Sequence, residues 1–367
     1  MVYKEKYLKI LSEAVDFIKC CDAGFRTTQG FGRRWLKNFF KNLKLVSHVL
    51  LYRPLDMSII ITGSGPGLEK TLPRIHEINS QVLIIAASSS VLALKHRGIN
   101  PNIIINTDGG SWALCHLHAC LREAGPFQGL AVNLCAALPS QCKQYPFLIL
   151  NEGSLWQTLV LSGLGIPSVI VGQRGTVSAS ALELALELGR GPVYMAGLDL
   201  CVNDIRTHAR PYGLDYLLYS SANRFKPLYS QFYKRANGIS GGKSLEIYAA
   251  WFRDKLKHLP DRIYSLDAHN TVFRNVQADS FSDQEPGSKN NFSALDFFKT
   301  QTVSGNPRQF CMQAIDILFK ALDDPRYETE LKTELIELLF PGKKNTCASE
   351  IQKELKTIAK KYSGNHG

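Results

Sequence analysis

The sequence predicts an α/β fold: a Rossmann-like, doubly wound, mainly parallel sheet with a helical N-terminal segment and a small α-helical C-terminal domain. Seven short, β-rich apolar runs follow one another, and a turn and a stretch with helical spacing come after each. The runs are apolar throughout rather than alternating, which is typical of strands covered by helices on both faces. They span residues 58–62, 82–86, 102–106, 130–133, 147–150, 168–171 and 192–196.

The pattern also predicts where domains begin and end in the 367-residue chain. Apolar residues recur at helical spacing within residues 1–50, the N-terminal helical segment. Residues 51–275 form the predicted Rossmann-like central domain. Residues 276–291 are polar and contain Pro286 and Gly287, which indicates a linker. Three helical patterns separated by prolines then predict a C-terminal helical domain over residues 292–367.

Charge and cysteine content limit the kinds of partner and compartment. The net charge of +11 favours anionic partners such as nucleotides or phosphosugars. No nucleic-acid motif is visible, and the longest charge-free run, 153–173, is interrupted by glycines and Pro167, so neither nucleic acid nor membrane is an expected partner. The nine scattered cysteines form no Cys-x-x-Cys pair, which favours reduced thiols and a cytoplasmic location.

A glycine-rich turn follows the first predicted strand of the central domain directly. It contains Gly63, Ser64, Gly65 and Pro66 and leads into a helix. Glycines let backbone N–H groups approach a ligand, and a helix N-terminus favours a phosphate. The turn lacks the Lys of a Walker A loop and the third glycine of a dinucleotide site. It therefore predicts phosphate binding, with a tight strand-to-helix turn as the alternative.

Polar residues also follow the next two strands. Ser88 and Ser89 come after the second run, and Asp108 and Gly109 come after the third. Because the carboxyl ends of parallel strands meet at one edge of the sheet, these side chains are expected in the ligand crevice. Asp108 suits a ribose hydroxyl or Mg²⁺; alternatively it caps the helix that begins near Ser111.

A second glycine-containing turn lies at residues 172–178. Arg174 stands where it can pair with a phosphate or carboxylate, and Thr176 or Ser178 can cap the following amphipathic helix. The helix N-terminus is expected to point into the crevice.

The last run of the series ends in a carboxylate, Asp199, and a short basic segment follows it. In that segment His208 lies between Arg206 and Arg210. A histidine between two arginines suits a general base, or a group that contacts a departing phosphate. Nearby arginine charges would keep the imidazole neutral near pH 7. The alternative is an ordinary surface histidine.

These motifs occur in a fixed order over residues 58–213: GSGP, NTDGG, a Thr-Val-Ser helix start, and GLDL followed by THA. Together they resemble the motility-associated factor (Maf) family and its relatives, the MptE-like 6-hydroxymethylpterin diphosphokinases. GLDL and GQRGTVS depart from the expected variants, which leaves the choice of substrate open. The resemblance implies a nucleotide-sugar site similar to that of sialyltransferases. It implies that Gly63–Pro66 hold the nucleotide phosphate, that Asp108 and Asp199 lie near ribose or sugar, and that Arg174 or Arg206 offsets a sugar carboxylate.

The activity that the resemblance implies is transfer of a nonulosonic acid, pseudaminic or legionaminic in type. The donor would be a CMP-activated sugar, the acceptor a Ser or Thr of flagellin, and the expected catalytic residues His208, as base, and Asp199. No cofactor is obligatory in this reaction. One alternative is an ATP- and Mg²⁺-dependent pterin diphosphokinase, in which Asp108 and Asp199 bind the metal. Another is a non-catalytic nucleotide-binding flagellar accessory protein.

Overall fold

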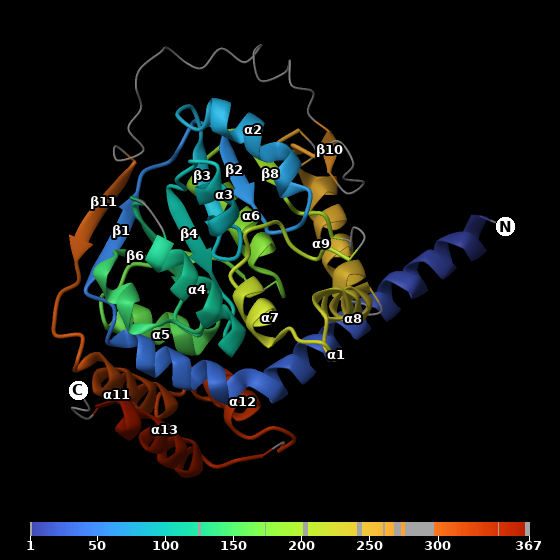
Figure 1. Ribbon diagram of the computed structural model, residues 1–367. Helices are drawn as coiled ribbons and strands as arrows, with labels where there is room; N and C mark the ends of the chain where they lie inside the picture. The colour runs from blue at the N-terminus through green and yellow to red at the C-terminus, as the bar shows by residue number, and fades with distance from the viewer. Residues whose placement is uncertain are drawn as a thin grey trace. The chain divides into compact units, whose positions relative to one another are not determined.

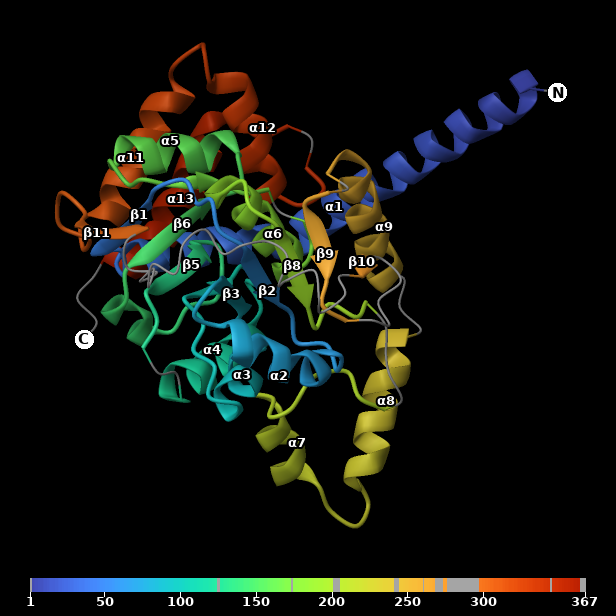
Figure 2. The same ribbon diagram turned by 90° about the horizontal axis from the view of Figure 1, so that it is seen from above.

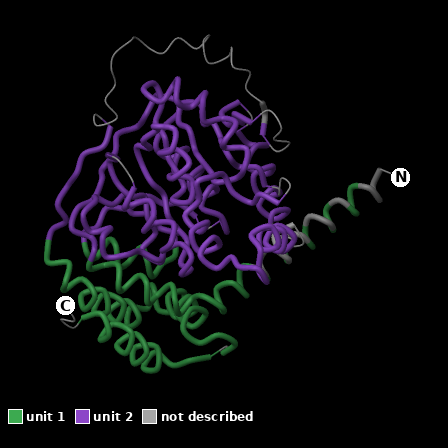
Figure 3. Tube along the Cα trace, viewed as in Figure 1, with its two compact units in different colours: residues 1–44, 154–164, 305–367 green, residues 45–153, 165–304 purple. Residues whose placement is uncertain are grey.

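The computed structural model describes residues 2–123, 126–172, 174–200, 205–240, 244–259, 261–267, 273–275, 297–343 and 345–363. The chain divides into two compact units (Figure 3). Unit 1 comprises residues 1–44, 154–164 and 305–367, and unit 2 comprises residues 45–153 and 165–304. Within the described residues, no helix combines the length and the apolar character needed to span a bilayer.

Unit 2 is built on an eleven-stranded sheet in its described part, with the order β10-β9-β8-β2-β3-β4-β5-β6-β1-β11 and with β7 paired to β6. The pairs are parallel except for β1 with β11. The strands are β1 (His48–Tyr52), β2 (Ile59–Thr62), β3 (Leu83–Ala87), β4 (Ile103–Asn106), β5 (Gly129–Asn133), β6 (Phe147–Asn151), β7 (Val169–Ile170), β8 (Val193–Ala196), β9 (Ile263–Ser265), β10 (Arg274–Asn275) and β11 (Phe298–Thr302). All seven predicted strands are confirmed.

Helices cover both faces of this sheet, as Figure 2 shows with α6 on one face and α2, α3 and α4 on the other. Ile59 and Ile61 of β2 belong to the apolar cluster that includes α6, whereas Ile60 between them is fully buried on the opposite face. The fold is therefore doubly wound, as predicted. The helices of unit 2 are α2 (Leu68–Ile78), α3 (Val91–His96), α4 (Ser111–Glu123), α6 (Val177–Leu188), α7 (Asp215–Ser221), α8 (Leu228–Ser240) and α9 (Ser244–His258), with a 3₁₀ turn, η1, at Ser140–Gln144.

The strand order reverses at β2. From there the chain adds β3, β4, β5 and β6 in one direction, and β8 then pairs with the other side of β2. In open α/β sheets ligands bind outside the carboxyl ends of the strands at such a switch point. The turns after β2 and β8 leave the sheet side by side here, so this edge is where the site is expected (Figure 1).

Unit 1 is helical. Its helices are α1 (Val2–Leu43), α5 (Leu155–Gly163), α11 (Phe310–Leu322), α12 (Glu328–Leu339) and α13 (Ala348–Ser363). The Phe39 and Trp156 rings meet edge to face at 4.7 Å between centroids. Glu334 of α12 accepts the backbone N–H groups of Leu155 and Trp156 at 2.9 and 3.0 Å. This carboxylate caps the N-terminus of α5, where free N–H groups and the helix dipole favour an anion.

The units differ from the predicted domain boundaries. Strand β1 lies across the end of the predicted helical segment 1–50, and β11 lies inside the predicted helical domain 292–367. These two strands pair with each other at the sheet edge. Most side chains of β11 are exposed, so this strand lacks the apolar pattern of a buried one. Helix α5, expected in the central domain, belongs to unit 1. The predicted linker 276–291 lies outside the described residues.

Candidate functional site

The glycine turn after β2 is hydrogen-bonded to the turn after β8. Gly63 N–H donates to Ala196 O at 2.8 Å, and Gly65 N–H donates to Gly197 O at 2.7 Å. Next along the chain, Gly67 N–H donates to Asp199 Oδ2 at 2.7 Å. Asp199 therefore places an anion directly at the start of α2, the position that favours negative charge.

This close approach explains why glycines stand here. A Cβ added at Gly65 would lie 2.8 Å from Gly197 O and would collide with the Asp199 carboxylate. A Cβ at Gly67 would collide with the carboxylates of Asp199 and Asp267. The turn thus needs glycine for packing against its own chain, the alternative that the sequence leaves open. That Gly63–Pro66 bind a phosphate stays a prediction.

Asp199 and Asp267 bring two carboxylates together at this edge. Burial raises the pKa of Asp199; the Gly67 hydrogen bond opposes this, and the charge of Asp267 adds to it. Asp267 is 8% exposed. Two adjacent carboxylates fit the protein ligands that Mg²⁺ takes beside nucleotide phosphates. Among the described residues, no group of three or more His, Cys, Asp or Glu side chains gathers as a metal site.

The segment 205–213 lies against the glycine turn. Ala209 N–H donates to Ser64 O at 2.8 Å, and Ser89 Oγ donates to Ser64 Oγ at 3.0 Å. Glu69, in the first turn of α2, accepts Arg210 N–H at 2.9 Å. The bonds of Ala209 and Arg210 hold the residue just before them, His208, beside the turn. Of the predicted residues, the structure thus brings together the Gly63–Pro66 turn, Ser89, Asp199 and His208.

His208 is a half-buried, neutral imidazole. Its Nδ1 lies 2.8 Å from Thr207 Oγ1, and its ring stacks on Tyr212 at 4.0 Å between centroids. Among the described residues, Nε2 has no hydrogen-bond partner. The pKa of His208 is lowered to about 3, mainly by burial and to a smaller extent by Arg235 and His116. The imidazole is neutral near pH 7, as the sequence predicts, but for a different reason. Burial is the main cause, and the arginine that contributes is Arg235 rather than Arg206 or Arg210.

Tyr212 links His208 to two residues that the motifs did not single out. Its hydroxyl lies 3.1 Å from His116 Nε2, and Arg235 donates to the same hydroxyl at 3.3 Å. Burial raises the pKa of Tyr212 to about 12, so the phenol keeps its proton near pH 7. The other ring nitrogen of His116, Nδ1, is buried and has no hydrogen-bond partner among the described residues.

Asp108 and Ser88 stand at the expected strand ends with local partners. Asp108 is exposed, and its Oδ1 accepts Gly110 N–H at 2.7 Å, next to Gly109 in the turn before α4. Its charge partly offsets the lowering of the His116 pKa, so it lies near this cluster. Ser88 Oγ, which is buried, donates to Asn106 Oδ1 at 3.2 Å. Ser88 therefore supports the end of β4.

Both arginines that were expected to offset ligand charge are paired with glutamates. Arg174 Nε donates to Glu183 Oε1 at 2.9 Å, and Arg206 forms an ion pair with Glu69 at 3.2 Å. Arg174 therefore joins the turn before α6 to the helix itself. The motifs around the two arginines do not indicate these pairings, because Glu183 and Glu69 lie on helices outside the motifs.

The helix start after Arg174 is only partly as predicted. Thr176 is the N-cap residue of α6, with extended backbone and no capping hydrogen bond from its side chain. Ser178 is buried, and its Oγ would lie 3.3 Å from a Cβ added at Gly63. Ser178 thus packs under the glycine turn.

Three buried asparagines end successive strands and were also missed. Asn106, Asn133 and Asn151 close β4, β5 and β6. Asn133 Oδ1 accepts Cys135 N–H at 2.7 Å, and Asn151 Oδ1 accepts Gly153 N–H at 2.9 Å. The repeated signal was in the sequence, since Asn ends two of the predicted apolar runs and directly follows a third. The side chains shape the turns at this edge.

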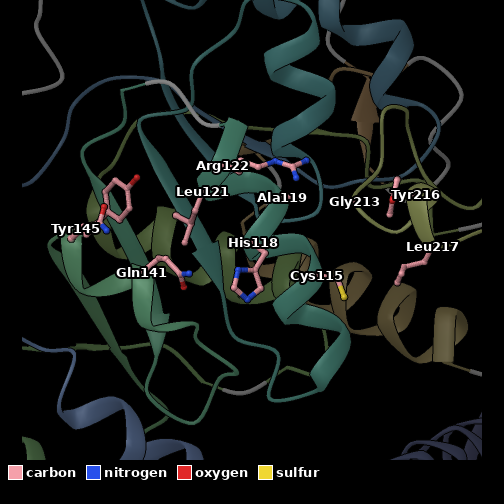
Figure 4. A pocket seen from close by; sticks show the side chains of 11 residues that line it. Cys115, His118, Ala119, Leu121, Arg122, Gln141, Tyr145, Gly213, Tyr216 and Leu217 are labelled. Carbon is pink, nitrogen blue, oxygen red and sulfur yellow. The ribbon is translucent and has the colours of Figure 1, made fainter. Parts of the chain in front are cut away.

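A cavity of about 720 Å³ lies between α4, η1 and α7 (Figure 4). Cys115 and His118 of α4 and Tyr216 and Leu217 of α7 are among its lining residues. None of the predicted site residues lines it. The cavity adjoins the His116–Tyr212 contact through Gly213, which lines it next to Tyr212.

The two neutral histidines predict an acid-sensitive stability. The usual histidine pKa is 6.5, and burial lowers it to about 4 at His116 and about 3 at His208. Below pH 6.5 the unfolded chain binds more protons than the folded one, so the free energy of unfolding should fall from pH 6.5 toward pH 4 and stay level above 6.5. Urea unfolding at pH 7.5 and 5.0 measures this. The double variant His116→Gln/His208→Gln should have a smaller difference in the free energy of unfolding between the two pH values, whereas the exposed His258→Gln should leave this difference unchanged. A double variant with the wild-type difference would contradict the burial argument.

Comparisons with known proteins agree with the motifs. Residues 33–204 match the family model "6-hydroxymethylpterin diphosphokinase MptE-like". An uncharacterized protein of Treponema pallidum (strain Nichols) is 30% identical over 270 residues, which cover 72% of this chain and 57% of that protein. A solved structure, the MAf glycosyltransferase from Magnetospirillum magneticum AMB-1, aligns with 13% identity and a TM-score of 0.47, over 90% of this chain and 54% of that one.

The chain therefore spans little more than half the length of either protein. The matched segment contains the glycine turn, Asp108 and Asp199, whereas His208, Tyr212 and Arg235 lie beyond it. Residues 33–204 thus match the model of one of the two families to which the motifs are similar, the 6-hydroxymethylpterin diphosphokinase MptE-like family.

Proposed function

We propose that this chain is a glycosyltransferase that moves a nonulosonic acid, pseudaminic or legionaminic in type, from a CMP-activated donor to a Ser or Thr hydroxyl of flagellin. The observation that carries the proposal is His208: a neutral imidazole with an unpartnered Nε2, fixed beside the Ser64 turn at the switch point. A general base must be neutral and within reach of the proton that it takes.

The reaction then needs one proton acceptor and one stabilised leaving group. His208 Nε2 takes the proton of the acceptor hydroxyl while the hydroxyl oxygen attacks the anomeric carbon. The bond between that carbon and the phosphate oxygen breaks, and CMP leaves with the electron pair. Arg235 supplies positive charge within the same cluster, which stabilises the anion as it forms.

Nucleotide binding is the first test of this proposal. Calorimetry with CMP, CDP, ATP and GTP should show a preference for the cytidine nucleotides. If all four fail to bind at millimolar concentration, the chain has no nucleotide site and the proposal is wrong. CMP binding without turnover of a CMP-sugar would instead favour the non-catalytic accessory protein.

Transfer should proceed without an obligatory divalent metal. The guanidinium of Arg235 can offset phosphate charge without a metal ion. Activity in EDTA should therefore equal activity in Mg²⁺ when transfer from a CMP-sugar is followed by CMP release. An activity that EDTA abolishes and Mg²⁺ restores would contradict this expectation.

Pterin diphosphokinase activity is the second candidate, and a specific observation favours it. The family description names this activity, and Asp199 and Asp267 place two carboxylates together at the switch point. With ATP, Mg²⁺ and 6-hydroxymethylpterin, AMP release that Asp267→Asn abolishes would support it. In this alternative the carboxylate neighbour of Asp199 is Asp267, rather than the Asp108 expected from the sequence.

A protein acceptor needs a docking surface, and the α7–α8 hairpin offers one. Residues 216–230 contain no Asp or Glu but two basic residues, Arg224 and Lys226. The same stretch exposes apolar rings, including Phe225 at 90% and Tyr216 at 77%. Exposed aromatic and basic side chains are typical of protein recognition surfaces. We propose that an acidic part of the acceptor docks there; Arg224→Glu/Lys226→Glu should raise the KM for protein acceptor without changing donor hydrolysis.

A further inference from the structure

Arg235 of α8 is a half-buried cation whose described contacts are all with an aromatic ring and its hydroxyl. Its guanidinium donates to Tyr212 Oη at 3.3 Å and lies 5.4 Å from the centroid of that ring. Within the part of the chain that the structure describes, Arg235 forms no ion pair. Removing a guanidinium from water without an anionic partner is costly.

The other arginines near this edge each have such a partner. Arg174 pairs with Glu183 at 2.9 Å and Arg206 with Glu69 at 3.2 Å. Arg210 lies 3.6 Å from Asp215. Asp215 is also close enough for Arg235 to lower its pKa, although burial raises that pKa overall. Arg235 is thus the arginine of this group whose charge no contacting carboxylate neutralises.

The three rings around Arg235 add no second positive charge. His208 and His116 have pKa values lowered to about 3 and about 4, and Tyr212 has one raised to about 12, so all three are neutral near pH 7. Asp108, whose charge acts to raise the pKa of His116, is exposed to solvent. The cluster of Arg235, Tyr212, His208 and His116 therefore carries one positive charge in a partly desolvated place.

We infer that this cluster is an oxyanion-binding site, in which Arg235 holds a carboxylate or phosphate group next to His208. A guanidinium has five N–H donors in a planar fork, and Tyr212 occupies one of them. The others can hold two oxygens of one anion. The His208 ring stacks on Tyr212, the residue that Arg235 contacts, so the bound anion lies beside the proposed base.

This inference rests on the proposed function and adds to it. The donor offers two such anions, the carboxylate of the sugar and the phosphate of CMP. Arg235 replaces Arg174 and Arg206, which the sequence suggested for this role. Its position beyond residue 204 also places it outside the segment that the family match covers.

Calorimetry with three probes tests the site: CMP, free N-acetylneuraminic acid and inorganic phosphate. Arg235→Gln should weaken binding of the anion that the site holds by about 10- to 100-fold, the usual effect of losing a charge-assisted hydrogen-bonded pair. Lys234→Gln, its exposed neighbour on α8, removes the same charge and should change binding less than threefold. Loss confined to the sugar acid identifies the carboxylate; loss confined to CMP and phosphate identifies the phosphate.

A second readout does not depend on ligand. Because Arg235 lowers the pKa values of His208 and His116, Arg235→Gln should raise both in an NMR titration, whereas Lys234→Gln should not. If Arg235→Gln fails to fold, Arg235→Lys keeps the charge and should weaken bidentate binding. If a folded Arg235 variant binds every probe with unchanged affinity, the proposed anion site is wrong. If that variant and the wild type both bind CMP, the proposed function is not contradicted by this result. Phosphate binding that depends on Arg235, with no binding of CMP or sugar acid, supports the site and overturns the function.

Discussion

His208→Ala should lower turnover by roughly two to four orders of magnitude, the range for a positioned acid–base group. The neutral ring has an unpartnered Nε2 and is held between Thr207 and Tyr212, so removal of the imidazole takes away the base and leaves the glycine turn intact. CMP affinity should stay within about threefold. Release of CMP in the presence of acceptor measures the rate, and calorimetry measures the affinity.

His118 of α4, which is outside the proposed site, supplies a control for the loss of a histidine. His118 lines the cavity beside α4, and its variant His118→Ala should keep full turnover. The pH profile gives an independent check: a base whose pKa is lowered to about 3 stays neutral in mild acid, so kcat/KM should be flat from pH 7 to about pH 5. Full turnover in His208→Ala, or a decline of kcat/KM centred near pH 6.5, would contradict the assignment.

The central sheet was predictable because buried parallel strands have a simple signature. Each of β2 to β8 is an apolar run, since helices cover both faces, and the runs mark the strands to within one or two residues. The strands at the two ends of the sheet were missed: β1 and β11 at one end, β9 and β10 at the other. In β11 only Phe298 is buried, and a strand with one buried face residue cannot be told from a loop by its composition.

The loops of the site were predictable, but their pairings were not. The carboxyl ends of parallel strands must meet, so Ser64, Ser89 and Asp199 gather at one edge whatever their distance along the chain. Which cation stays unpaired depends on tertiary neighbours. Arg174 and Arg206 find Glu183 and Glu69 on helices, whereas Arg235, within a helix and next to no motif, meets the Tyr212 hydroxyl.

Gly65→Val should abolish nucleotide binding and also destabilise the fold. The sequence alone predicts the first effect with the fold intact, because a side chain would block backbone approach to a phosphate. The structure instead predicts a loss of stability. A Cβ at Gly65 would lie 2.8 Å from Gly197 O, a backbone atom that cannot rotate away, and would collide with the Asp199 carboxylate. Overpacking of this kind costs about 1–3 kcal/mol, so the free energy of unfolding should drop by about 3 kcal/mol for Val and about 1 kcal/mol for Ala.

Urea unfolding measures these costs, and a double-mutant cycle separates their causes. Asp199→Ala removes the carboxylate but leaves Gly197 O in place, so it should rescue part of the loss in Gly65→Ala, with a coupling of about 0.5 kcal/mol or more. Gly30→Ala is the matched control: it lies on the exposed face of α1 with nothing within 4 Å of its Cβ, and it should stabilise by about 0.5–1 kcal/mol. If Gly65→Val unfolds at the wild-type urea midpoint, the two turns do not approach each other as closely as Gly65 and Asp199 indicate, and the helix start would be open to a phosphate.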